Sequence, residues 1–162
     1  MERKGILLAI LACASTAAAD SRVVIESATD DTRAPSAERK RNSTTLRHTL
    51  DQLITTHSLK ANAHIDASVV SLTVERSDNL VIVSAQVRIA ISDDTGRIHS
   101  VLSGGAKVEA PARMYRARGR IGLRNDALSA AVTGMFDKVK TVIAPMPKTK
   151  VRVAMARSFT SS

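Results

Sequence analysis

The sequence is poor in cysteine and in aromatic residues. Cys13 is the only cysteine among 162 residues, and it lies close to the N-terminus. The rest of the chain has no thiol, which excludes intramolecular disulfides and a cysteine nucleophile there. Tyr115, Phe136 and Phe159 are the only aromatic residues. Their scarcity argues against a stacking platform for single-stranded nucleic acid, so no nucleic-acid partner is expected.

Catalytic and metal-binding motifs are lacking too. The histidines are His48, His57, His64 and His99, and none has metal-type spacing to another ligand on one element. Neither G-x-S-x-G nor S-x-x-K occurs. We therefore predict no catalytic residue, no metal site and no cofactor. The alternative is a small exported enzyme of the hydrolase type, with a site assembled from distant residues such as His64, Asp66 or His99.

The first nineteen residues have the three-part pattern of a secretory signal peptide. Arg3 and Lys4 give a positive start, residues 6–14 are an uncharged apolar run, and Ala17–Ala19 supply small residues before Asp20. The apolar run is far shorter than the ~20 residues that span a bilayer as a helix. Residues 1–19 are thus predicted to direct bacterial export to the periplasm or outer membrane.

Cys13 leaves two alternatives for the mature N-terminus. The stretch Ile10-Leu11-Ala12-Cys13 resembles a lipobox, in which the cysteine is acylated and begins the mature protein. The other alternative is cleavage after Ala19, which removes Cys13 with the signal peptide. Either way, residues 20–162 are long enough for one domain with its own core, and we expect 20–42 to be partly flexible.

Positive charge is concentrated in the last third of the chain. The formal net charge is +9, and residues 107–162 hold twelve basic and three acidic residues. The densest cluster is Arg113, Arg116, Arg118, Arg120 and Arg124. If extended, Arg116, Arg118 and Arg120 would share one face, because strand side chains alternate. Such a row suits phosphate or carboxylate groups. The alternative is a solvated loop whose charge aids solubility.

Hydrophobic periodicity predicts the secondary structure. A short strand at Val23–Ile25 precedes a polar loop that can become helical after Ser36. A helix capped by Ser43 follows, with its apolar stripe on Leu46, Leu50, Leu53 and Ile54. Alternation predicts three strands at residues 68–76, 80–92 and 97–108, with Gly104-Gly105 as a bulge or twist. Asn125 caps a second helix, and Lys150–Phe159 alternates like an edge strand.

This order of elements predicts an α+β fold. A mostly antiparallel sheet of about four to five strands would have two helices packed on one face. Val83, Val87 and Ile89 of the central strand would point into the core. They would face a stripe on the second helix formed by Leu128, Val132 and Met135.

The pattern resembles the curli-secretion lipoprotein and penicillin-binding-protein-activator group of bacterial envelope proteins. Three features carry the resemblance: the opening strand and helix, the strand 66–74, and the hairpin turn Asp94-Thr95-Gly96-Arg97-Ile98 before an Ala-rich helix over 127–144. The amino-terminal domain of the Tol-Pal translocation protein is similar more distantly. The chain departs from the group at Ser68, where glycine is usual. The resemblance implies a non-enzymatic binding or assembly role and no catalytic residues.

The sequence therefore favours an exported binding or assembly module of the bacterial envelope. The arginine cluster would contact an anionic envelope component or a partner protein, and peripheral membrane contact is compatible with its charge.

Overall fold

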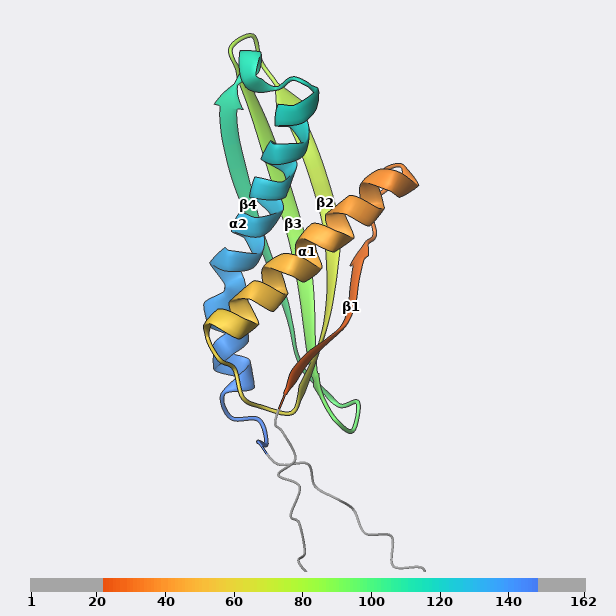
Figure 1. Ribbon diagram of the computed structural model, residues 1–162, viewed down its shortest axis with the longest axis vertical. Coiled ribbons are helices and arrows are strands. Elements are labelled where there is room, and N and C mark those ends of the chain that lie inside the picture. The colour runs from red at the N-terminus through yellow and green to blue at the C-terminus, as the bar shows by residue number, and fades with distance from the viewer. Residues whose placement is uncertain (1–21, 149–162) are drawn as a thin grey trace, which may run out of the picture.

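The structure, a computed structural model, describes residues 22–148, apart from the side chains of residues 117 and 118. A four-stranded sheet carries two long helices on one face (Figure 1). The elements are β1 (Val23–Asp30), α1 (Ser36–Thr56), β2 (Ala63–Arg76), β3 (Leu80–Asp93), β4 (Ile98–Pro111), the short 3₁₀ helix η1 (Ala112–Met114) and α2 (Ala117–Ile143). The predicted α+β fold is confirmed.

The strands lie in sequence order across the sheet. β1 and β2 are parallel, because α1 crosses the sheet between them as in a βαβ unit. The β2–β3 and β3–β4 pairs are antiparallel hairpins. The sheet is therefore mixed, with two of its three pairings antiparallel.

The core lies between the sheet and the two helices. Val83, Val87 and Ile89 of β3 are completely buried there, as the alternation of the strand predicts. Leu128, Val132 and Met135 of α2 belong to the same buried cluster. This confirms the prediction that the face of β3 with Val83, Val87 and Ile89 meets the apolar stripe of α2. Leu46 and Leu50 bring α1 into this core. The opposite face of the sheet carries no helix in the described part of the chain.

Helix α1 begins at Ser36, so the prediction that Ser43 caps it is wrong. Of the two alternatives for the segment after Ser36, the structure shows the helix, because most of the charged residues between Ser36 and Asn42 are good helix formers. Ser43 lies inside the helix, where its hydroxyl donates to the carbonyl of Arg39 at 2.9 Å. Helix formation here brings the basic start of α1 over the sheet.

Helix α2 likewise begins earlier than predicted, at Ala117 instead of Asn125. Gly119 and Gly122 lie near the start of α2, and because glycine is a poor helix former, the sequence pattern there is typical of a loop. Gly119 is needed because a Cβ there would collide with the carbonyl oxygen of Met114. The expectation that Arg116, Arg118 and Arg120 share a strand face is therefore wrong, because this segment is helical.

The predicted bulge at Gly104-Gly105 is absent from the described β3–β4 pair, whose register is continuous there. The glycines serve close packing instead. A Cβ on Gly104 would lie 2.8 Å from Sδ of Met135, and one on Gly105 would lie 2.8 Å from the carbonyl oxygen of Ala85. Gly104 therefore lets α2 pack close to β4, and Gly105 lets β4 lie close to β3.

Several predictions fall outside the described residues: the signal segment 1–19, the candidate lipidation site Cys13, and the edge strand Lys150–Phe159. Between residues 22 and 148, neither helix combines the length and apolarity required to cross a bilayer.

Candidate functional site

A small groove lies between the first halves of α1 and α2, which both begin in the upper half of Figure 1. Its walls are Glu38, Arg41 and Asn42 from α1 and Arg120, Ile121, Arg124 and Asn125 from α2. Three arginines and one glutamate give the lining an excess of positive charge. The enclosed volume is about 40 Å³, which suits one small group or a few waters.

Arg124 is the most enclosed arginine of the groove. Its guanidinium forms an ion pair with Glu38, and the two side chains are 21% and 22% exposed. Burial disfavours the charged form of Arg124, but the hydrogen bond and charge of Glu38 outweigh it and raise its pKa. Nε of Arg124 is buried without a hydrogen-bond partner among the described residues. The side chain is thus held in place with donor capacity left over.

Buried polar contacts fix the walls of the groove. Asn42 is almost fully buried, and its amide nitrogen donates to Asp30 of β1 at 2.7 Å. On the other wall, Thr45 donates to the amide oxygen of Asn125 at 3.2 Å. These bonds tie α1 to the sheet and to α2, so Arg41 and Arg120 project from rigid helices.

Only part of the predicted arginine cluster reaches the groove. Arg120 and Arg124 line it, four residues apart on one helix face. Arg113 in η1 and Arg116 before α2 are exposed and lie outside it. The side chain of Arg118 is outside the described set. Arg41 was not among the predicted site residues, because it lies far in the chain from the C-terminal arginine cluster.

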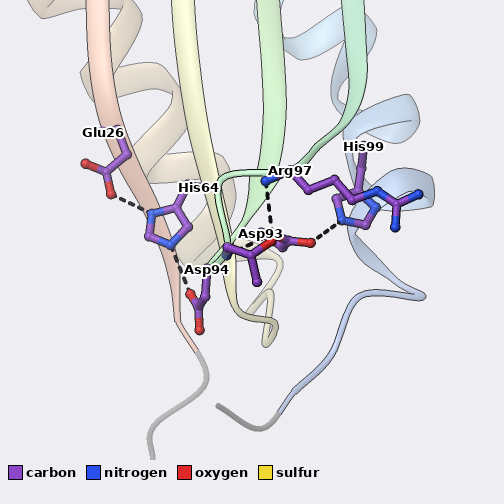
Figure 2. A network of polar contacts seen from close by, with 7 residues as sticks. Glu26, His64, Asp93, Asp94, Arg97 and His99 are labelled. Atoms are coloured by element: carbon purple, nitrogen blue, oxygen red, sulfur yellow. Dashed lines mark hydrogen bonds and ion pairs between the residues drawn. The ribbon is translucent and has the colours of Figure 1, made fainter. Parts of the chain in front are cut away.

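A second polar network lies at the opposite end of the sheet, around His64 of β2 (Figure 2). Nδ1 of His64 lies 2.5 Å from Glu26 of β1, and Nε2 lies 3.0 Å from Asp94 in the β3–β4 turn. Hydrogen bonds to Asp94 and Glu26 raise the pKa of His64. Only the protonated ring donates through both nitrogens, so the network favours imidazolium.

The neighbouring turn is organised by Asp93 (Figure 2). Its carboxylate accepts from the hydroxyl of Thr95 at 2.5 Å and from the backbone of Thr95 and Arg97, while Nε2 of His99 lies 2.8 Å away. The hydrogen bonds from Thr95 and His99 hold the pKa of Asp93 well below its usual range. These hydrogen bonds fix the turn between β3 and β4.

His64 and Asp66, two of the candidates for an enzymatic site, have separate hydrogen-bond partners. Asp66 accepts a hydrogen bond from Ser27 at 2.6 Å, and the partners of His64 are Glu26 and Asp94. Both ring nitrogens of His64 are occupied, which leaves neither free to exchange a proton with a substrate. In the described region, no three His, Cys, Asp or Glu side chains are placed to hold a metal ion. The geometry is that of a structural clasp between β1, β2 and the turn.

The fold has counterparts among solved structures. A minor lipoprotein from Acinetobacter baumannii superposes with a TM-score of 0.50 at 10% identity, over 78% of this chain and 96% of that one. A candidate lipoprotein from Caulobacter crescentus CB15 superposes with a TM-score of 0.46 at 16% identity, over 64% of this chain and 81% of that one. A hypothetical protein from Chlamydia trachomatis superposes with a TM-score of 0.46 at 12% identity, over 75% of this chain and 97% of that one.

No protein-family model matches the sequence. No curated protein matches it either. At 10% identity the match to the minor lipoprotein establishes likeness of fold, and it does not single out the curli-secretion or penicillin-binding-protein-activator group.

Proposed function

We propose that this protein is an exported, non-enzymatic component of the bacterial envelope that binds an anionic group in the groove between α1 and α2. The observation that carries the proposal is the convergence of Arg41, Arg120 and Arg124 from two helices on one small hollow. Guanidinium groups bind phosphate and carboxylate oxygens through paired, charge-assisted hydrogen bonds. The three guanidinium groups around this small volume carry more positive charge than the single carboxylate of Glu38 neutralises.

The size of the groove points to a phosphate group carried by a larger molecule. About 40 Å³ accommodates the head of such a ligand, and the remainder would lie outside over the exposed helix ends. Lipid head groups and lipopolysaccharide provide phosphates of this kind in the envelope. Arg113 and Arg116 are exposed in the segment just before α2, where they would add longer-range attraction and peripheral membrane contact.

Location in the envelope is supported by two independent observations. Residues 1–19 have the pattern of a signal peptide. The fold is also shared with a minor lipoprotein of a Gram-negative bacterium. The occupied ring nitrogens of His64 favour binding over the hydrolase alternative.

A matched pair of double variants tests the binding claim. Arg41→Ser with Arg120→Ser removes two charges from the groove, whereas Arg113→Ser with Arg116→Ser removes two exposed charges outside it. Cosedimentation with vesicles rich in anionic phospholipid should weaken at least ~10-fold for the groove variant and far less for the control. Binding should also fall with added salt, because exposed charges are screened over about 8 Å at physiological ionic strength. Equal losses in both variants would show that only total charge matters.

The export claim has a separate test. Mass spectrometry of the protein from its native host should find a mature N-terminus at Asp20 or an acylated Cys13. An intact Met1 terminus in the cytoplasm would contradict the envelope location.

A further inference from the structure

The two edge strands of the sheet, β1 and β4, differ in how well they are protected against pairing with a further strand. β1 is short, and its register to β2 shifts between Ile25 and Ser27. Arg47 of α1 donates to the carbonyls of Ile25 and Glu26 at 2.8 and 3.2 Å. A short, irregular strand whose carbonyls are occupied by an arginine is a poor template for another strand.

β4 is protected only near its ends, by a register shift beside His99 and by Lys107 and Pro111. It runs for 14 residues from Ile98 to Pro111, and its register to β3 is continuous from Ser100 onward. No side chain of the described region bonds to its backbone, and no described strand lies on its outer side. The stretch from Ile98 to Ala106 contains no Asp, Glu, Lys or Arg. Ile98 and Val101 are 62% and 55% exposed.

An edge strand of this length leaves a row of unpaired N–H and C=O groups, and natural proteins usually interrupt such an edge with lysine, proline or a bulge. We propose that β4 pairs antiparallel with β4 of a second copy of this chain, joining the two four-stranded sheets into one. The uncharged middle of β4 lets the strand meet itself without like-charge contacts.

The alternation of side chains restricts the register of this pairing. Both pairs of helices stay on one side of the joined sheet only if residues of the same face oppose each other. A twofold axis through Ser103 meets that condition. It places exposed Val101 of one copy opposite Gly105 of the other, where there is room for it.

Light scattering and a charge placed at the edge test the pairing. The full chain carrying Cys13→Ser, which removes any acyl anchor, should be a dimer in solution. Adding Val101→Lys should make it monomeric with an unchanged circular dichroism spectrum. Val70→Lys is the matched control, because Val70 is an exposed valine on the interior strand β2, and this variant should remain dimeric. A monomeric parent, or dissociation caused equally by Val70→Lys, overturns the proposal.

Disulfide trapping tests the register and does not depend on how Val101→Lys folds. Directly opposed residues have Cβ atoms about 4.5–5.5 Å apart, close enough for a disulfide after small adjustment. In the Cys13→Ser chain, Ser103→Cys should therefore give a covalent dimer on mild oxidation. Thr29→Cys, exposed on β1, should give little. If Ser103→Cys forms no more dimer than Thr29→Cys, β4 is not the dimer contact.

Discussion

Glu38 in the first turn of α1 and Arg124 of α2 form an ion pair that joins the two helices at the proposed binding groove. The pair fixes the most enclosed arginine while leaving Arg41 and Arg120 exposed in the same lining. One arginine therefore has a structural contact, and the other two are available to a ligand.

Arg124→Gln should destabilise the protein and Arg120→Gln should not. Loss of Arg124 leaves Glu38 without its partner in a partly enclosed site, and for a pair that still contacts solvent we expect a cost of about 1 kcal/mol. Arg120 is exposed, so its replacement should stay within about 0.5 kcal/mol. Urea unfolding measures both. Equal effects would mean that the ion pair does not join the helices.

Val87→Asp should prevent folding. Val87 is fully buried in β3, and an unpaired carboxylate there would cost several kcal/mol, a large share of the stability of a domain this size. Gln86→Asp provides the control, because Gln86 is exposed on the other face of the same strand. Circular dichroism on heating should show a cooperative transition for Gln86→Asp only. A cooperative transition of Val87→Asp would contradict the assigned core face.

Two glycine-to-alanine substitutions should change the stability of the protein in opposite directions. A Cβ on Gly104 would lie 3.2 Å from Cβ and 2.8 Å from Sδ of Met135, so Gly104→Ala should cost about 1 kcal/mol or more. A Cβ on Gly134 meets nothing within 4 Å, and alanine is the better helix former by about 1 kcal/mol. Gly134→Ala should therefore raise the melting temperature, and a lowered value would show strain that the structure does not reveal.

The strands were predictable because their side chains alternate. The alternation in β3 identified its buried face, including Val83 and Val87, without any tertiary information. The helix starts were not predictable in this way. Their first turns are charged and carry no apolar stripe, and Gly119 is present for a close approach to Met114 that only the fold reveals.

The groove was only half predictable for the same reason. Arg120 and Arg124 belong to a local cluster that is visible in the sequence. Arg41 is far from them in the chain, and it joins them only because α1 begins early and packs beside α2. The partners of His64 were also hidden, since Glu26 and Asp94 lie on other elements.

His64 should make stability depend on pH. Its pKa is raised in the folded protein, so its contribution is fully present below its unfolded pKa, near 6.5, and is lost as pH rises through the folded pKa. His64→Gln should remove this loss from a plot of unfolding free energy against pH. His48→Gln, at an exposed helix position, should leave the plot unchanged. A parent protein whose stability does not fall above neutral pH would contradict the clasp.

The central claim is that the groove between α1 and α2 holds an anionic group, and an NMR titration with inorganic phosphate tests it most directly. The claim predicts saturable shifts of the side-chain Nε–H signals of Arg41, Arg120 and Arg124. The signals of Arg113 and Arg116 should move little, and the shifts should disappear in the Arg41→Ser, Arg120→Ser variant. Equal, non-saturating shifts of all five arginines, or none, would contradict a site in the groove.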